Sequence, residues 1–135
     1  MLTGKCINPE IMEALALCGH GSRILIADGN YPLKNRTSDA KRIYVGLKPG
    51  MPTVTDVLET LCSVMNFEAA AVMEPEDGME PEIFAEFRSR LPDAAFERMK
   101  RYEFYNSCCE SQVEVAISTG ETRTSANILL TVGCA

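Results

Sequence analysis

Residues 19–28 read GHGSRILIAD, and this stretch decides how the rest of the chain is interpreted. It holds the only histidine of the chain, His20, between two glycines, followed by a short apolar run and then Asp28. The two glycines leave the imidazole open to a ligand, because neither neighbour has a side chain. Imidazole also gives and takes protons readily near neutral pH. The stretch therefore predicts a buried strand with a proton-transfer group before it and a carboxylate after it.

Length, charge and hydropathy limit the classes of protein to which the chain can belong. Its 135 residues are enough for one domain with its own core. The formal net charge of −6 argues against a nucleic-acid partner, since phosphate neutralisation needs a basic surface. No apolar run approaches the roughly 20 residues of a membrane span, and residues 1–6 lack the apolar core of a signal peptide. We expect a single domain over residues 1–135, without a membrane partner, in the cytoplasm.

The chain has six cysteines, at positions 6, 18, 62, 108, 109 and 134. None of them forms a C-x-x-C pair, and a single histidine gives little support to a zinc site. The neighbours Cys108 and Cys109 could form a redox-sensitive pair. Reduced thiols that pack as small apolar side chains are the simpler interpretation in a cytoplasmic protein. We expect no metal site.

Helical and strand patterns alternate along the chain. Apolar residues at helical spacing, together with N-cap signals at Asn8 and Thr53, predict helices over residues 9–18, 54–65, 81–91 and 102–110. The first helix is expected to bury Ile7, Ile11, Met12, Ala14, Leu15 and Cys18. Apolar runs predict strands over residues 24–27, 42–45, 67–73, 113–117 and 128–132. Residues 95–100 fit neither pattern. This alternation predicts one three-layer α/β/α domain with a mostly parallel central sheet, in an order that the pattern leaves open.

Several motifs follow one another in an order that resembles a known family. They are Gly19-His20, an apolar strand, Asp28-x-x-x-Pro32, then RYEFY at 101–105, TGE at 119–121 and NILL at 127–130. Their order and approximate spacing resemble the D-ribose pyranase / L-fucose mutarotase family over nearly the whole chain. The blocks at 101–105 and 119–121 are closer to the fucose branch than to the ribose branch.

The resemblance implies a cofactor-independent isomerase that interconverts anomers or ring sizes of a free monosaccharide such as L-fucose or D-ribose. It implies His20 as the proton donor and Asp28 as a sugar-binding residue. It also implies sugar binding by Arg101 and by Asn127, the last residue of a triplet in which Ser125 replaces the family's tyrosine. It further implies a ring-shaped homo-oligomer, with a decamer as one candidate.

The implied chemistry suits the residues, but their spacing sets a condition. Opening a hemiacetal ring takes one proton from the anomeric hydroxyl and gives one to the ring oxygen, which is general acid–base work that one imidazole can do. If residues 20–28 were fully extended, His20 and Asp28 would lie about 26 Å apart. Either the segment around His20 curls back, or two subunits share each pocket. We favour the shared pocket.

Other interpretations of the same residues stay open. Serine at position 125 lacks the aromatic surface and phenolic hydroxyl of tyrosine, which favours a relative that binds or senses sugar without catalysis; Tyr31 and Tyr102 are candidates to fill the space. His20 on a small α/β domain also fits a phosphocarrier in sugar uptake. Without the resemblance, His20 could simply cap a helix end, and Asp28 is a good turn residue.

Overall fold

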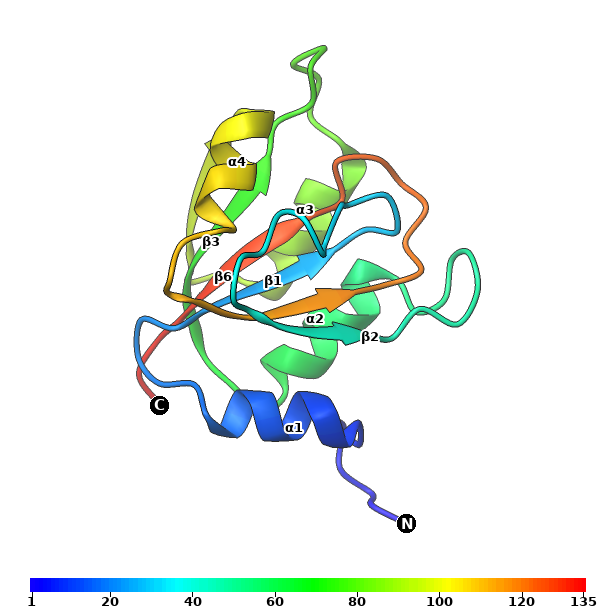
Figure 1. Cartoon of the computed structure of the whole chain (residues 1–135), viewed down its shortest axis with the longest axis vertical. Coiled ribbons are helices and arrows are strands. Elements are labelled where there is room, and N and C mark those ends of the chain that lie inside the picture. Colours follow the sequence, from blue (N-terminus) through cyan, green and yellow to red (C-terminus); the bar gives the residue numbers. More distant parts are fainter.

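The computed structural model, which describes residues 1–135, is built around a sheet of six strands (Figure 1). The strands are β1 (Arg23–Ala27), β2 (Lys41–Tyr44), β3 (Phe67–Met73), β4 (Ala95–Met99), β5 (Val113–Ser118) and β6 (Ile128–Val132). Their order in the sheet is β2-β5-β1-β6-β3-β4. All neighbours pair in parallel except β6, which runs antiparallel to β1 and β3. The predicted mostly parallel sheet is confirmed.

The ends of the strands form two opposite edges of the sheet, which are distinct from its outermost strands β2 and β4. The five parallel strands all end at one edge, which we call the carboxyl edge, and β6 begins there because it runs the other way. Asp28 follows β1 and Asn127 precedes β6, so both lie at the carboxyl edge. His20 precedes β1 and therefore lies at the opposite edge, which we call the amino edge.

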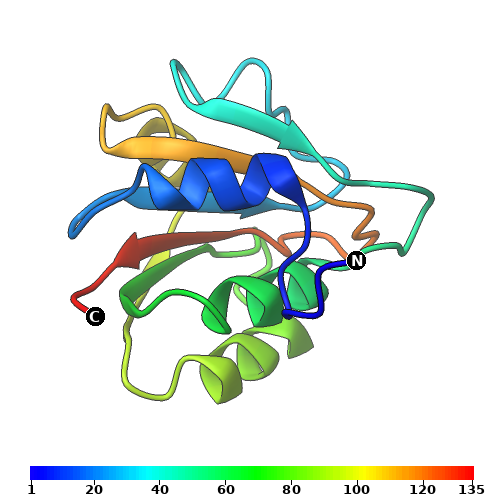
Figure 2. The ribbon, with the colours of Figure 1, turned by 90° about the horizontal axis from the view of Figure 1, so that it is seen from below.

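Helices cover both faces of the sheet. They are α1 (Pro9–Ala16), α2 (Val54–Cys62), α3 (Glu82–Arg90) and α4 (Arg101–Ser107). α1, α2 and α3 share an apolar cluster with Ile24 and Ile26, whereas α4 and the loop at 28–40 pack with Leu25 and Ala27. Successive residues of a strand point to opposite faces, so β1 is buried on both sides. Figure 1 shows α4 in front of the sheet, and Figure 2 shows α2 and α3 side by side below it.

Two helix starts follow from local hydrogen bonds that the sequence predicts. The side chain of Asn8 accepts from the backbone N–H of Ile11 at 3.0 Å, and Pro9 occupies the first turn of α1. Thr53 and Asp56 form a reciprocal capping box at α2, with bonds of 2.8 and 3.0 Å. Each cap satisfies backbone donors that a helix start would leave unpaired.

Some boundaries differ from those that the pattern predicts. Residues 95–99 form β4, an edge strand that pairs with β3, and the helix expected at 102–110 spans Arg101–Ser107. The prediction that Ile7 and Met12 are buried is wrong, since they are 52% and 42% exposed. Ile7 precedes the N-cap, and Met12 lies about 100° round the helix from the buried Ile11.

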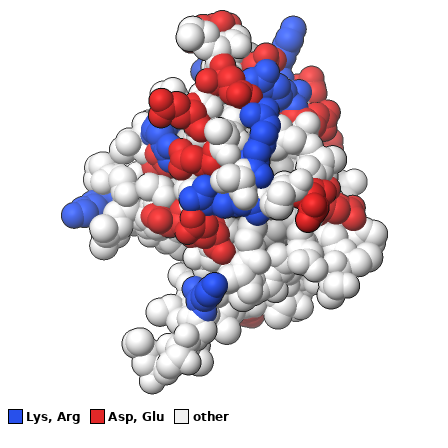
Figure 3. All heavy atoms as spheres, turned by 180° about the vertical axis from the view of Figure 1, so that it is seen from behind, with Lys and Arg blue, Asp and Glu red and all other residues white.

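The surface carries both signs of charge close together. On the face opposite to that of Figure 1, Lys and Arg side chains lie with Asp and Glu side chains on both sides of them (Figure 3). Ion pairs account for part of this mixing, for example Glu80 with both Arg88 and Arg98. No helix in the fold has the length and apolar character needed to cross a membrane.

Candidate active site

Asp28 and Asn127 meet at the carboxyl edge, where the pairing of β1 with β6 places the end of one strand beside the start of the other. The Asn127 side-chain oxygen accepts from the backbone N–H of Asp28 at 2.8 Å, and its Nδ2 donates to Asp28 Oδ2 at 3.2 Å. Both residues are 3% exposed. The structure therefore brings together two of the residues that the sequence predicts as sugar-binding.

The Asp28 carboxylate also organises the backbone around it. Oδ2 accepts from the N–H of Ala126 at 3.2 Å, and Oδ1 accepts from the N–H of Asn30 at 2.9 Å. These bonds and the one from Asn127 use three of about four acceptor positions of a carboxylate. Burial raises the pKa of Asp28, and the hydrogen bonds from Asn30 and Ala126 offset only part of that rise. Asp28 thus anchors the loop that follows β1.

Ser125 lies next to this pair in an unusual backbone conformation. Its φ is +56°, in the left-handed region that non-glycine residues seldom adopt. Ser125 comes directly before Ala126, whose backbone N–H donates to Asp28 Oδ2. Tyr31 and Tyr102 are the two candidates to take the place of the tyrosine that Ser125 replaces. Tyr31 is buried and donates its hydroxyl to the Arg36 carbonyl, and Tyr102 is 66% exposed on α4. Tyr31 is therefore a core residue.

The loop after β5 supports the loop after β1. The hydroxyl of Thr119 donates to the Ala27 carbonyl at 2.8 Å, and the N–H of Gly29 donates to the Glu121 carbonyl at 2.9 Å. A Cβ at position 29 would lie 3.1 Å from that Glu121 oxygen, so a side chain would crowd the contact. The Thr-Gly-Glu block thus fixes the backbone that carries Asp28.

Glu121, which is buried, and Arg123, whose side chain is 41% exposed, form a clamp that sequence reasoning did not identify. Glu121 is 3% exposed, and each of its carboxylate oxygens accepts a hydrogen bond from the Arg123 guanidinium at 3.0 Å. Arg123 also reaches Glu86 on α3, and Glu121 accepts from the N–H of Val54 at the start of α2. Burial raises the pKa of Glu121, but the bonds from Arg123 outweigh it and hold the pKa below its usual value. The ionised pair ties the site loop to both helices.

A hollow of about 470 Å³ opens at the carboxyl edge beside these loops. Most of its lining residues are polar or glycine: Gly29, Asn30, Gly46, Leu47, Lys48, Pro49, Thr119, Gly120, Glu121 and Thr122. Its lining includes Gly29, the residue after Asp28, but neither Asp28 nor Asn127 itself. The groups around the hollow suit a polar ligand better than an apolar one.

His20 lies at the amino edge, apart from Asp28. Its side chain is 58% exposed, and its Nε2 is 3.0 Å from Oε2 of Glu68, the second residue of β3. The five residues of β1 that separate the two edges span about 16 Å at about 3.3 Å each. The alternative in which the His20 segment curls back to Asp28 is therefore wrong. Glu68 was also missed, although it is the one charged residue of a strand that reads FEAAAVM.

Arg101 lies at the carboxyl edge but not beside Asp28. It begins α4 directly after β4, and its guanidinium pairs with Glu76 at 3.1 Å, with both side chains well exposed. β4 is three strands from β1 in the sheet, which corresponds to about 14 Å at about 4.8 Å per strand. A single chain thus leaves Arg101 and His20 apart from the Asp28–Asn127 pair.

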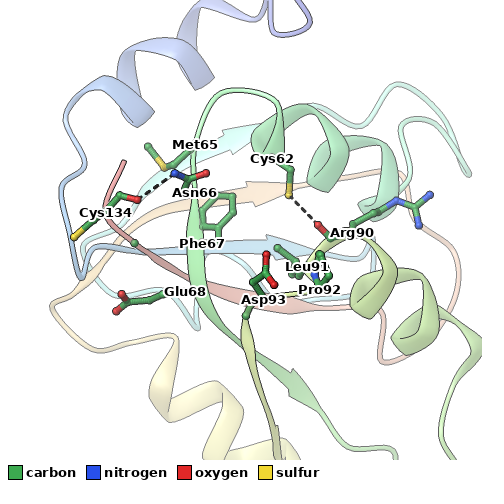
Figure 4. Close-up of a pocket in the computed structure, with 12 residues that line it drawn as sticks. Cys62, Met65, Asn66, Phe67, Glu68, Arg90, Leu91, Pro92, Asp93 and Cys134 are labelled. Carbon is green, nitrogen blue, oxygen red and sulfur yellow. Dashed lines mark hydrogen bonds between the residues drawn. The ribbon is translucent and has the colours of Figure 1, made fainter.

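Two further hollows adjoin one another at the amino edge. One, of about 420 Å³, is lined by Glu68, Arg90, Asp93 and Cys134 among others (Figure 4). The other, of about 390 Å³, includes His20 and Val64, and the two share Cys62, Met65, Asn66 and Gly133 in their linings. The imidazole is therefore accessible from an open depression.

The chain is a small α/β domain with a mixed six-stranded sheet and helices on both faces. Proteins of this class can place a site at the ends of the strands, where this chain has its polar groups. Within that class, the chain belongs to the RbsD / FucU transport protein family, whose model matches residues 1–135. The family that the motifs predict is confirmed.

Individual relatives agree with this assignment. The chain is 35% identical over 127 residues to the D-ribose pyranase of Bacillus cytotoxicus, across 94% of this chain and 93% of that protein. It is 32% identical over 127 residues to the D-ribose pyranase of Bacillus mycoides, with the same two shares.

Solved structures show the same fold. RbsD of Bacillus subtilis, complexed with D-ribose, superposes with a TM-score of 0.87 at 24% identity, over 100% of this chain and 99% of that chain. The fucose mutarotase of Streptococcus pneumoniae, in complex with L-fucose, superposes with a TM-score of 0.77 at 23% identity, over 96% and 94%. The predicted α/β fold is confirmed.

Proposed function

We propose that this protein is a cofactor-independent isomerase that interconverts the cyclic forms of a free monosaccharide. The observation that carries the proposal is the 35% identity to a D-ribose pyranase across 94% of the chain. The buried Asp28–Asn127 pair supports it, because a carboxylate and an amide offer the acceptors and donors that sugar hydroxyls need.

In the proposed reaction His20 is the general acid and base. The imidazole is exposed, so a ligand can contact it. Opening the sugar ring needs only general acid–base catalysis. Asp28 and Asn127 would hold sugar hydroxyls, and Arg101 offers a planar fork of donors to another part of the sugar. Ser125 would keep a hydroxyl near the pocket, at a shorter reach than tyrosine.

His20 lies at the amino edge of the sheet, whereas Asp28 and Asn127 lie at the carboxyl edge. We therefore propose that each pocket is shared by two copies of the chain. One copy supplies His20, and its neighbour supplies Asp28 and Asn127. Each copy then contacts its two neighbours through two different surfaces. Such head-to-tail contacts close into a ring when the rotation from one copy to the next is a whole fraction of a full turn. This arrangement favours a ring-shaped homo-oligomer, and the family resemblance makes a decamer one candidate. A fully active monomer in sedimentation analysis would contradict it.

Two sugars are the leading substrates. The pyranase relatives favour D-ribose, whereas the blocks at residues 101–105 and 119–121 resemble the fucose branch and favour L-fucose. Whether the product differs in anomer or in ring size depends on which hydroxyl closes the open-chain form. The cytoplasmic location stays a prediction of the sequence.

Two-dimensional exchange NMR of anomeric protons tests the proposal directly. D-Ribose, L-fucose and a panel of other aldoses are each measured with the wild-type protein, with His20→Ala and without protein. We expect exchange cross-peaks that need the wild-type protein, and the sugar that shows them is the substrate. If no sugar in the panel exchanges faster with the wild-type protein than without it, the isomerase function is excluded.

A second candidate function is sugar binding without catalysis, which Ser125 in place of a tyrosine favours. If the protein only binds sugar, the anomeric NMR lines of the sugar broaden on binding. The rate of anomeric exchange then stays equal to the rate measured without protein. The Ser125→Tyr variant would then be tested for a gain of exchange. Phosphate transfer through His20 predicts instead a mass increase after incubation with a phosphorylated carrier.

A further inference from the structure

Glu68 is the one charged residue of β3, and its carboxylate meets His20. Glu68 Oε2 lies 3.0 Å from His20 Nε2, and this is the only hydrogen bond of the imidazole within the chain. A carboxylate that emerges from a half-buried strand and meets the proposed acid–base residue is a candidate for orienting that residue. The proposed function as stated above does not use it.

The strand geometry redirects Glu68 specifically. β3 pairs Phe67 with Val132 and Ala69 with Thr131 of β6, so Glu68 is the extra residue of a β-bulge. Bulges bend a strand, re-aim a side chain and are frequent next to active sites. A Cβ at Gly133 would lie 3.3 Å from Glu68 Cβ and 3.4 Å from its backbone nitrogen, so glycine gives the bulge its room.

The backbone that carries His20 is tied to the same strand, β6. The N–H of Gly21 donates to the Val132 carbonyl at 2.9 Å, and the N–H of Val132 donates to the Ser22 carbonyl at 2.9 Å. Gly21 has φ of +88°, which glycine adopts without a steric penalty. The end of β6 therefore holds both the His20 segment and the bulge that presents Glu68.

The surroundings leave Glu68 free to pair with the imidazole. Arg90 lines the same hollow, but its guanidinium pairs with Glu59, and in Figure 4 the side chain of Glu68 points away from it. The side chains of His20 and Glu68 are 58% and 49% exposed. An exposed pair of this kind adds little to the stability of the fold. We therefore expect it to matter for the orientation of the imidazole ring.

We propose that Glu68 is a positioning residue for His20: it accepts the Nε2 hydrogen and leaves Nδ1 to exchange protons with the sugar. This proposal rests on the proposed isomerase function. A neutral imidazole donates from one nitrogen and accepts at the other. An ionised carboxylate only accepts, so it selects the tautomer with hydrogen on Nε2 and orients the ring.

The proton balance of the step is complete. The Nδ1 lone pair takes the anomeric hydroxyl proton, the O–H electron pair becomes the carbonyl bond, and the bond between the anomeric carbon and the ring oxygen breaks. The imidazolium returns the Nδ1 proton to the ring oxygen, which becomes a hydroxyl. Both sugar oxygens are attached to the anomeric carbon, so one nitrogen can serve both. Ring closure on the other carbonyl face reverses these steps.

Nitrogen NMR of the imidazole tests the tautomer, because the chain has one histidine and gives one pair of ring signals. The full-length protein is labelled with ¹⁵N-histidine and measured above the pH at which the ring becomes neutral. In the wild type we expect hydrogen on Nε2 and a bare Nδ1. Glu68→Gln offers both an acceptor and a donor, so it should hold the ring in this tautomer less strictly than Glu68 does, and Glu68→Ala should give a mixture. A wild-type ring with hydrogen on Nδ1, or no change in Glu68→Ala, overturns the proposal.

Exchange kinetics with the same variants test the consequence for catalysis. We expect Glu68→Ala to slow sugar exchange about 10-fold or more, by analogy with groups that orient a metal-binding histidine. Glu68→Gln should recover part of the loss. Glu97→Gln, at an exposed position of β4, is the matched control and should leave the rate unchanged. The double variant His20→Ala/Glu68→Ala should be no slower than His20→Ala alone.

The outcomes separate this inference from the function on which it rests. If His20→Ala loses exchange while Glu68→Ala keeps the full rate, the positioning role is wrong and the isomerase function stands. If the wild type catalyses no exchange, the function fails, and the nitrogen spectra still decide whether Glu68 sets the tautomer. A double variant slower than His20→Ala shows that Glu68 acts independently of His20 and also contradicts the proposal.

Discussion

Asp28 and Asn127 lie 99 positions apart in the chain and are joined by two hydrogen bonds, of 2.8 and 3.2 Å, at the carboxyl edge. Asn127 satisfies both the backbone N–H and one carboxylate oxygen of Asp28, in a place where water has almost no access. A buried polar group without a partner costs free energy. Their pairing therefore stabilises the fold as well as shaping the site.

Replacing Asn127 by alanine should destabilise the protein. The change leaves the Asp28 N–H buried without its acceptor, and we expect the free energy of unfolding to fall by about 1–3 kcal/mol. Urea unfolding followed by circular dichroism measures this. Asn106→Ala, at an exposed position of α4, is the matched control and should change the value by less than about 0.5 kcal/mol. Equal effects of the two variants would contradict the anchoring role.

Arg123→Ala should destabilise the fold in a pH-dependent way. It leaves the buried Glu121 carboxylate with only backbone donors, and we expect a loss of about 1–3 kcal/mol near neutral pH. A glutamate whose folded pKa is lowered stabilises the fold above its unfolded pKa, and this stabilisation is lost as pH falls through the folded pKa.

The difference between wild type and Arg123→Ala should therefore shrink as the pH is lowered through that range. Thermal unfolding at a series of pH values measures the difference. Arg101→Ala removes an ion pair that is exposed on both sides and is the control, with an expected change below about 0.5 kcal/mol. A difference that stays constant down to strongly acid pH would show that Glu121 does not carry the effect.

Sugar binding should weaken on acidification at a higher pH than for an ordinary aspartate. Burial raises the pKa of Asp28, so the carboxyl becomes protonated above the usual range near about 3.9 and loses acceptor capacity. Binding is therefore strongest above this raised pKa and falls as the pH drops through it. NMR titration of the sugar into His20→Ala isolates the effect from turnover. Asp28→Asn should abolish the acid-side dependence, and a variant that keeps it would contradict this assignment.

His20→Ala should lower the rate of catalysed exchange about 100-fold or more, the usual scale of a general acid–base contribution. The side chain is more than half exposed, so its loss should leave the unfolding transition almost unchanged. Saturation transfer between anomeric signals measures the rate. A folded variant with the wild-type rate would remove His20 from the mechanism.

Most of the fold could be predicted from the sequence because its signals are local. Asn8 and Thr53 cap the helices that they predict, and the apolar run at 24–27 is a strand buried on both faces. The strand order, including the antiparallel β6, depends on contacts between distant segments that no short pattern specifies. β4 was missed because an edge strand with mixed polarity lacks a clear period.

The site could be predicted only in part. The motif order indicates Asp28 and Asn127, which the fold brings together. It does not indicate Arg123 or Glu68, whose contacts with Glu86 and His20 join distant parts of the chain. A charged residue inside the apolar stretch at 67–73 was the available signal for Glu68. Sequence spacing did indicate that His20 and Asp28 are far apart, and a β-strand keeps them so.

A mixing experiment tests most directly whether this protein is an isomerase whose pocket combines His20 of one copy with Asp28 of the next. His20→Ala and Asp28→Asn are co-expressed with different tags, and assemblies that carry both tags are purified and assayed by exchange NMR. Each variant alone should be almost inactive. Random mixing restores an intact His20 opposite an intact Asp28 in about one pocket in four, so we predict about one quarter of the wild-type rate. Mixed assemblies as inactive as either parent would contradict the shared pocket.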